Sequence, residues 1–348
     1  MQCAIVTDTH LGARNNCTIV NTHFLEFFSE LFFPTLERYN IRNVFHLGDL
    51  GEYKRSVNTL ILDSWNQQVF KKLQDYSVWM LCGNHDLFYK NNNSVSLQSS
   101  LELADRFGFA VVQDKLVTVE DIDLIPWLST SNYTTILAQV ENSISNYLFG
   151  HLEVTGALMT PGIFCTESQL DLNLLSKYRR VLSGHFHLRS TVSNVTYIGN
   201  PYQIIWSDAN QLKGFVLFDT EKNVLQYINN PKSLFSKLFI NTEEDIEQVD
   251  PTHYKTKHVK IFVNYSVSQQ KVFNLVTLLE KYSPLSVIVQ ESRPDITEIT
   301  QNSEYQDTFF YVREYVDSLY SQNKIGLDKQ RLINKLDTIY NRAQTRVI

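Results

Sequence analysis

Five short apolar runs in the sequence each end abruptly in polar residues. The run at 78–82, for example, stops at Gly83 and is followed at once by an amide, an imidazole and a carboxylate. Apolar runs of this length, bounded by turn-forming residues, are typical of buried strands. The five runs occupy residues 3–7, 43–47, 78–82, 147–149 and 181–183.

Segments with helical spacing of apolar residues lie between these strand-like runs. Residues 18–39 form the clearest such segment, although Pro34 is expected to end or kink the helix. Residues 57–73 and 97–107 follow a similar pattern. Because strands alternate with helices, the sequence predicts an α/β layered domain. Ligands in such domains bind at the carboxyl ends of strands, so the five polar clusters should meet at one rim.

The polar residues that follow the runs offer oxygen and imidazole nitrogen donors and no thiolate. Glycine stands directly before them at four of the five run ends, where it permits a sharp turn and the close approach of a bound group. Such donors suit divalent first-row metals such as manganese, iron or zinc. Each cluster alone is also explained by a turn or an exposed strand, whereas the ordered set of five requires five coincidences. The candidate ligands are Asp8, His10, Asp49, Asn84, His151, His185 and His187.

Composition narrows the class of protein further. With 348 residues, 43% of them hydrophobic, the chain is long and apolar enough to bury a sizeable core. No apolar run reaches the length of a membrane span, and the start MQCAIVTDTH lacks the features of a secretory signal, so we expect a cytoplasmic protein without a membrane partner. The net charge of −6 gives no global attraction to DNA, so DNA binding would need local basic patches or a partner protein.

The ordered motifs resemble those of the calcineurin-like metallophosphoesterases. The resemblance implies a two-sheet sandwich flanked by helices, holding two divalent ions, with Mn²⁺ preferred over Mg²⁺, Fe²⁺ or Zn²⁺. One ion would be held by Asp8, His10, Asp49 and His187, and the other by Asp49, Asn84, His151 and His185, with Asp49 as the bridge. The motifs are Asp8-x-His10, Gly48-Asp49, Gly83-Asn84-His85-Asp86, Gly150-His151 and Gly184-His185-x-His187.

The implied reaction is hydrolysis of a phosphate ester, because paired ions activate a water and neutralise the charge that develops on the phosphate. The resemblance leaves His85 without a metal. A histidine beside such a site can donate to the phosphoryl oxygens or protonate the leaving oxygen, which makes His85 a catalytic candidate. Asp86 is the second candidate, either by orienting that ring or, alternatively, by holding the turn.

Within this superfamily the sequence more closely resembles the SbcD-type nuclease subunits of SbcCD complexes, including bacteriophage recombination nucleases. The segments DLIPW at 123–127, YIGNPYQ at 197–203 and KGFVLFDT at 213–220 follow the SbcD order. The resemblance implies exonuclease or endonuclease action on DNA in repair and recombination. Many SbcD relatives carry a histidine three residues after the bridging aspartate, where it helps position DNA for exonuclease cleavage, but Glu52 occupies that place here.

The second half of the chain suggests additional parts beyond a nuclease domain at 1–230. A strand, helix and strand pattern at 257–289 resembles the α+β capping domain of SbcD proteins, placed at 231–290; the alternative is an extension of the sandwich. A polar linker at 291–303 precedes a C-terminal helix pair at 304–348. By resemblance, this pair binds an SbcC-type ATPase in a heterotetramer that contains a homodimer of this subunit. Alternatively, the pair packs back onto its own domain.

Two other functions remain open on the sequence alone. A stand-alone small-molecule phosphodiesterase would use the same site and would be indifferent to the terminal helices. A catalytically inactive, metal-binding adaptor would only organise the ATPase on DNA. The intact ligand set and His85 argue against the adaptor, because an adaptor has no need for a catalytic acid.

Overall fold

The computed structural model describes residues 1–166, 169–292, 332, 333 and 335. The chain divides into two compact units, one made of Met1–Phe262 and Val267–Gln290, the other of Val263–Ser266 and Glu291–Ile348. The predicted linker and helix pair lie outside the described residues, except for 291 and 292, which end a strand, and three helical residues near the C-terminus. The predicted boundary at 230/231 falls inside the first unit and stays a prediction.

The first of two six-stranded sheets combines four parallel strands with an antiparallel pair. The parallel strands are β1 (Gln2–Val6), β2 (Asn43–His46), β3 (Ser77–Leu81) and β4 (Ala110–Val112). The antiparallel strands are β13 (Gly214–Asp219), which pairs with β1, and β14 (Val224–Asn229), which pairs with β13. The order across the sheet is β14-β13-β1-β2-β3-β4.

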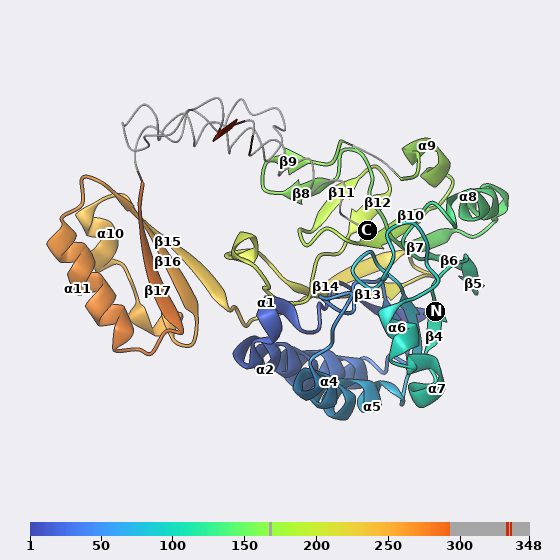
Figure 1. Cartoon of the computed structure of the whole chain (residues 1–348), viewed down its shortest axis with the longest axis horizontal. Coiled ribbons are helices and arrows are strands. Elements are labelled where there is room, and N and C mark those ends of the chain that lie inside the picture. Colours follow the sequence, from blue (N-terminus) through green and yellow to red (C-terminus); the bar gives the residue numbers. More distant parts are fainter. Residues whose placement is uncertain (167–168, 293–331, 334, 336–348) are drawn as a thin grey trace. The chain divides into compact units, whose positions relative to one another are not determined.

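The second sheet has the same number of strands and an antiparallel strand at each edge. Its parallel strands are β6 (Ile122–Ile125), β7 (Tyr147–His151), β10 (Arg180–Gly184) and β12 (Val195–Tyr197). The edge strands are β5 (Val117–Val119) and β11 (Ser190–Val192), in the order β11-β12-β10-β7-β6-β5. Figure 1 shows the two sheets layered, with helices outside them.

Side chains alternate between two apolar cores along each central strand, because successive residues of a strand point to opposite faces. In β1, Cys3 belongs to the core shared by the two sheets, whereas Ala4 belongs to the core under the helices of the first sheet. In β7, Phe149 belongs to the shared core and Leu148 to the outer core of the second sheet. The predicted α/β sandwich flanked by helices is therefore confirmed.

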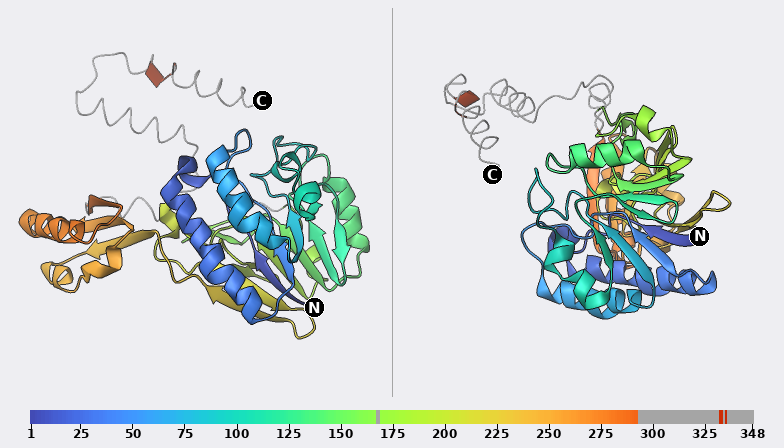
Figure 2. Two further views of the ribbon diagram at one scale, coloured as in Figure 1. Left: turned by 90° about the horizontal axis from the view of Figure 1, so that it is seen from below. Right: turned by 90° about the vertical axis from the view of Figure 1, so that its right-hand side faces the viewer.

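The helices between Ala13 and Phe107 cover the outer face of the first sheet (Figure 2). The predicted helix at 18–39 runs as α2 (Thr18–Phe27), a π-helical turn (Phe28–Phe32) and α3 (Phe33–Arg38). Pro34 does not end it. A proline disrupts the regular bonding of an α-helix, and here the wider π-helical turn directly precedes it.

The remaining helices are short. The predicted helix at 57–73 is α4 (Thr59–Trp65), a π-helical turn (Asn66–Phe70) and α5 (Lys71–Leu73), and the one at 97–107 is α6 (Leu97–Ser100) and α7 (Leu103–Phe107). The second sheet is flanked by α8 (Tyr133–Asn142) and α9 (Leu172–Leu175). Among the described residues, none of the helices combines the length and the apolar character that a membrane span requires.

A separate three-stranded sheet follows the sandwich in the sequence, in the order β15-β16-β17. Its strands are β15 (Phe235–Ile240), β16 (His258–Asn264) and β17 (Ser286–Ser292), accompanied by α10 (Glu243–Glu247) and α11 (Gln269–Glu280). Strand, helix and strand thus occur where the pattern at 257–289 predicted them. Leu275 and Leu279 of α11 are buried.

The packing of α8 on the second sheet yields a matched test of this architecture. The side chain of Ile136 in α8 is fully buried, whereas Ile144, just after the helix, is 97% exposed. We expect Ile136→Ala to lower the free energy of unfolding by about 2–5 kcal/mol, because it leaves a cavity in the outer core. Ile144→Ala should change it by less than about 0.5 kcal/mol. Urea unfolding of both variants measures the difference, and equal losses would contradict the placement of α8.

Candidate metal centre

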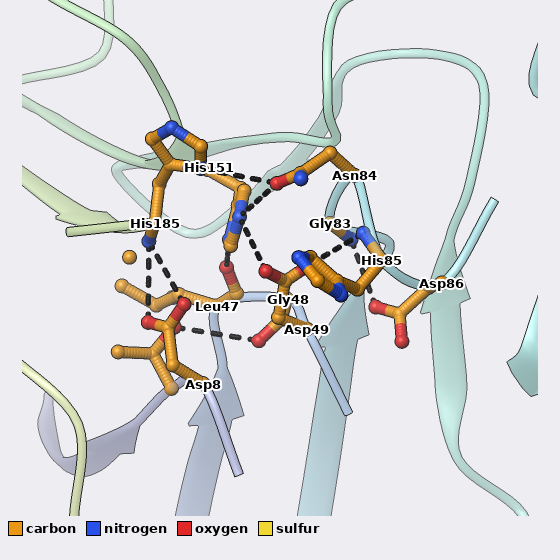
Figure 3. A network of polar contacts seen from close by, with 12 residues as sticks. Asp8, Leu47, Gly48, Asp49, Gly83, Asn84, His85, Asp86, His151 and His185 are labelled. Atoms are coloured by element: carbon orange, nitrogen blue, oxygen red, sulfur yellow. Dashed lines mark hydrogen bonds and ion pairs between the residues drawn. The ribbon is translucent and has the colours of Figure 1, made fainter. Parts of the chain in front are cut away.

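The predicted ligands lie at the carboxyl ends of strands from both sheets. Those after β1, β2 and β3 come from the first sheet, and those at the ends of β7 and β10 come from the second. The alternation of strands and helices predicts that the clusters meet at one rim. They do meet, at strand ends that belong to two sheets, and Figure 3 shows several of the side chains converging there. The residues brought together are Asp8, His10, Asp49, Asn84, His85, His151, His185 and His187.

The segments after β1 and β2 run side by side through the site, joined by backbone hydrogen bonds. The N–H of Asp8 donates to the carbonyl of Gly48 over 3.0 Å, and that of His10 donates to the carbonyl of Asp49 over 3.1 Å. The pairing of the two parallel strands therefore continues beyond their ends. This continuation sets the positions of three candidate ligands relative to one another.

Several of these residues adopt a backbone conformation that non-glycine residues rarely take. The φ angles of Asp8, His10, Asp49 and His185 are 53°, 45°, 53° and 86°. Left-handed backbone at such residues costs roughly 1–3 kcal/mol each and persists only when the surrounding structure holds it. Four candidate ligands share this left-handed conformation. The interactions that place their side chains in the site therefore outweigh the local backbone preference.

The glycines before the polar residues are required by close approach. A Cβ atom at Gly83 would overlap both the backbone nitrogen and a carboxylate oxygen of Asp49. At Gly48, where φ is +102°, a Cβ would lie 2.5 Å from Nδ1 of His151. Glycine therefore allows the segments after β2, β3 and β7 to come together without a clash.

One cluster of potential ligands consists of Asp8, His10 and His187. One donor atom from each lies within 4.8 Å of those of the others. Nε2 of His10 and Nε2 of His187 are 3.1 Å apart. The cluster matches the set predicted for one ion, apart from the proposed bridge.

A second cluster consists of Asp49, His151 and His185, with the amide of Asn84 between the two imidazoles. Oδ1 of Asn84 is 3.0 Å from Nε2 of His151 and 3.0 Å from Nδ1 of His185. Oδ2 of Asp49 is 3.4 Å from Nε2 of His151 and 3.9 Å from Nε2 of His10. Asp49 therefore faces imidazoles of both clusters, which is compatible with its predicted role as a bridging ligand.

The hydrogen-bonding capacity of these groups fits a cation. Nδ1 of His151 faces the carbonyl oxygen of Leu47 at 2.7 Å, and Nε2 of His185 faces a carboxylate oxygen of Glu153 at 3.0 Å. Both oxygens only accept, so in the neutral ring each outer nitrogen carries the proton and the inner nitrogen presents a lone pair. These lone pairs face further acceptors on Asn84 and Asp49. A divalent ion bound by nitrogen and oxygen satisfies such a collection of acceptors.

The pKa values reflect the same surplus of acceptors. Burial lowers the pKa of His10, but its contact with Glu52 and the charges of Asp49 and Asp8 outweigh burial and raise the pKa to about 9. Burial likewise lowers the pKa of His151, and the facing carboxylate of Asp49 raises it to about 9. Burial alone would raise the pKa of Asp49, yet these histidines hold it well below its usual range. Without a metal, protons on the imidazoles supply the positive charge.

His85 and Asp86, the predicted catalytic residues, lie next to the two clusters but have different partners. The backbone N–H of His85 donates to Oδ1 of Asp49 over 2.8 Å, and its ring Nδ1 is 3.1 Å from the carbonyl oxygen of Glu52. The carboxylate of Asp86 accepts from the N–H of Gly51 over 3.1 Å and from that of Gly83 over 2.9 Å. Asp86 thus ties two loops together, and Figure 3 shows it beside Gly83.

Sequence reasoning missed several residues around the site. The carboxylate of Glu153 contacts Nε2 of His185. Glu153 lies two residues after His151 of the Gly-His motif, but no sequence pattern identifies it as part of the site. A buried ion pair, Asp208 with Lys213 at 2.6 Å, supports His187, whose carbonyl oxygen accepts from Lys213 over 2.9 Å. Buried charges of this kind are rare, so the sequence provided no reason to expect them.

The segment YIGNPYQ stands out in the sequence only as a family feature, and the structure gives it a physical role. The hydroxyl of Tyr202 donates to the carbonyl of Thr9 over 2.7 Å, between the first two candidate ligands in the sequence. The amide of Asn200 is 3.4 Å from Nδ1 of His187. The segment therefore supports ligands contributed by both sheets.

Comparison with known proteins agrees with these observations. No protein-family model matches the sequence. The chain is 26% identical over 304 residues to exonuclease subunit 1 of Enterobacteria phage T4, covering 85% of this chain and 86% of that protein. It is 25% identical over 173 residues to the SbcD component of the nuclease SbcCD of Staphylococcus epidermidis, covering 42% of this chain and 46% of that protein. A solved structure described as a novel archaeal phosphodiesterase overlaps 66% of this chain and 100% of its own at 14% identity and a TM-score of 0.33, too low to support the fold.

The two-sheet sandwich and the ordered motifs are similar to those of the calcineurin-like metallophosphoesterases. The two sequence relatives are both named as nuclease subunits, one of them of SbcCD, in agreement with the predicted resemblance to SbcD-type subunits.

The position of Asp49 between the clusters leads to a test by metal titration. Asp49→Ala should weaken both binding steps for Mn²⁺, because it removes a carboxylate that faces both clusters. His10→Ala should weaken mainly one step, because its inner nitrogen faces only the first cluster. Outer-shell effects are commonly 10- to 100-fold, so the loss of a direct ligand should be at least about that large. Calorimetric titration that found the same single-step loss in both variants would contradict the bridging position.

Proposed function

We propose that the chain is a dinuclear metal-dependent phosphodiesterase that cleaves DNA as the nuclease subunit of an SbcCD-like complex. The observation that carries the proposal is the convergence of acceptors into two neighbouring clusters, with Asp49 of the second cluster 3.9 Å from His10 of the first and the imidazole of His85 beside them. The two sequence relatives, both named as nuclease subunits, support DNA as the substrate.

In this proposal one ion is held by Asp8, His10, Asp49 and His187, and the other by Asp49, Asn84, His151 and His185. When bound, two such ions acidify a water, orient the phosphate and neutralise developing charge. We propose Mn²⁺ as the native ion because the donors mix carboxylate, amide and imidazole groups, although Mg²⁺, Fe²⁺ and Zn²⁺ also accept some of these donors. The chain itself holds the substrate-facing groups and excludes bulk water from Asp8, Asp49 and His151, which are buried.

The orientation of His85 suits a proton donor. Its Nδ1 faces a carbonyl oxygen, which only accepts, so Nδ1 carries a proton and Nε2 is left to act on the substrate. In its protonated form the ring donates from Nε2 to a phosphoryl oxygen or to the leaving oxygen. We propose that Asp86 contributes by holding the loops that carry His85, since both its oxygens accept from backbone N–H groups.

The wider assembly is also part of the proposal. We place the protein in the cytoplasm, the host cytoplasm if the chain comes from a phage, where it acts on DNA with an SbcC-type ATPase as a homodimer within a heterotetramer. The helix pair at 304–348 would bind the ATPase, and the unit at 231–290 would contact DNA. A partner that supplies the DNA-binding surface fits a chain whose own net charge is −6.

The role of His85 can be separated from metal binding by substitution. We expect His85→Ala to retain two metal equivalents and to lose cleavage by about 10²- to 10⁴-fold, the usual contribution of general acid–base catalysis. His253→Ala is the matched control, because the side chain of His253 is 77% exposed and far from the motifs in sequence. Metal content and cleavage rate on defined DNA ends are the measurements. Loss of a metal equivalent along with activity would sink the assignment, and no loss of activity would point to an adaptor or another acid.

Truncation distinguishes the nuclease subunit from a stand-alone phosphodiesterase. A chain ending near Ser303 lacks the proposed helix pair but keeps every candidate ligand. We expect it to fold, bind two metal ions and hydrolyse a small phosphodiester at the full-length rate, while losing co-purification with the ATPase and ATP-dependent cleavage of duplex DNA. Failure to fold would show that the helices complete the chain's own core. Undiminished ATPase binding would place the interface elsewhere.

A further inference from the structure

We propose that Glu52 is a positioning residue that orients both a metal ligand, His10, and the acid, His85. The side chain of Glu52 contacts one imidazole, and its main-chain carbonyl contacts the other. The inference rests on the metal site proposed above and assigns a role to the position where many SbcD relatives carry histidine.

The backbone at Glu52 is fixed from two directions. Its own N–H donates to the carbonyl of Leu11, in the segment after β1, over 3.0 Å. The N–H of the preceding residue, Gly51, donates to the buried carboxylate of Asp86, in the segment after β3, over 3.1 Å. Groups attached to this backbone are therefore held relative to both neighbouring loops.

The side chain of Glu52 sets the direction of His10. A carboxylate oxygen of Glu52 lies 2.9 Å from Nδ1 of His10, while Nε2 of the same ring faces His187 at 3.1 Å. Because a carboxylate only accepts, this close contact favours the tautomer of the neutral ring that has its proton on Nδ1 and the lone pair of Nε2 directed into the first cluster. Outer partners of this kind commonly fix the tautomer and ring orientation of metal-binding histidines.

The carbonyl oxygen of Glu52 does the same for His85. It lies 3.1 Å from Nδ1 of His85, so it holds the proton on that nitrogen. The rings of His10 and His85 meet edge to face, with centroids 4.9 Å apart. One residue thus fixes the relative orientation of a ligand and the neighbouring acid.

Glu153 is a natural point of comparison, because it stands in the same relation to a ligand of the other cluster. Its carboxylate is 3.0 Å from Nε2 of His185, whose Nδ1 faces Asn84. Both glutamates are partly exposed, with 28% and 34% of their side-chain areas accessible. Each cluster therefore has one histidine in contact with a carboxylate that is not in the set predicted for the two ions. Glu52 also lies within 4.8 Å of donor atoms of both His10 and His85, so the test must distinguish a positioning role from direct ligation.

The test is calorimetric titration of the metal-free full-length protein with Mn²⁺ alone. We expect Glu52→Ala to weaken, by about 10- to 100-fold, the binding step that His10→Ala also weakens, and to leave the other step unchanged. Glu153→Ala should weaken the other step instead. Glu52→Gln should retain most of the affinity, because its amide oxygen still accepts from Nδ1, and Glu280→Ala, at an exposed position, is the control.

A spectroscopic measurement separates orientation from general destabilisation. In the Zn²⁺-saturated protein with ¹⁵N-labelled histidine, we expect NMR to detect a hydrogen-bonded proton on Nδ1 of His10, and Glu52→Ala to abolish that signal. The His85 signal should persist, because the carbonyl remains. The glutamine variant keeps the test decisive if the alanine variant does not fold.

Three results would overturn the inference: unchanged affinity in Glu52→Ala, weakening of the same step by Glu52→Ala and Glu153→Ala, or equal losses in the glutamine and alanine variants. The last is the behaviour of a direct, charged ligand. None of these measurements uses DNA. A protein that binds two ions but cleaves no DNA would therefore refute the proposed nuclease function and leave the role of Glu52 intact.

Discussion

The closeness of Asp49 to its neighbours is the constraint on which the site depends. Its carboxylate faces imidazoles from two clusters and also accepts from the backbone of His85. Such crowding is possible only because Gly83 and Gly48 lack side chains and because Asp49 itself takes a left-handed backbone. The two parallel loops after β1 and β2 hold that conformation through bonds between their main chains. The unfavourable backbone conformation of Asp49 is thus stabilised by hydrogen bonds that continue the pairing of β1 and β2 beyond the strand ends.

The sequence predicted the fold well wherever a single physical signal dominated. Short apolar runs bounded by polar residues located the five strands that carry the site, because buried strands need little more than this pattern. Pro34 does not end the helix at 18–39, which continues through a π-helical turn before the proline. That the strands belong to two sheets was not readable from the runs, because strand pairing depends on contacts between distant residues, and it entered only through the family resemblance.

The inner part of the site was more predictable than its supports. Candidate ligands follow strand ends in recognisable motifs, and the structure brings all of them together. The groups behind them are ordinary residues in unmarked positions, such as the carbonyl of Leu47 or the carboxylate of Glu153. Their roles arise from where the fold places them, so no local pattern identifies them. Residues 304–348, proposed for partner binding, lie almost entirely outside the described structure, and their role remains a prediction.

Both clusters combine candidate ligands from the two sheets, which affects the stability of the whole sandwich. In the first, Asp8 and His10 follow a strand of one sheet and His187 follows a strand of the other; in the second, Asp49 comes from the first sheet and both imidazoles from its partner. Each ion would therefore link the two sheets of the sandwich. Because a ligand that binds only the folded state stabilises it, the metal concentration would change the free energy of unfolding of the domain as well as its activity.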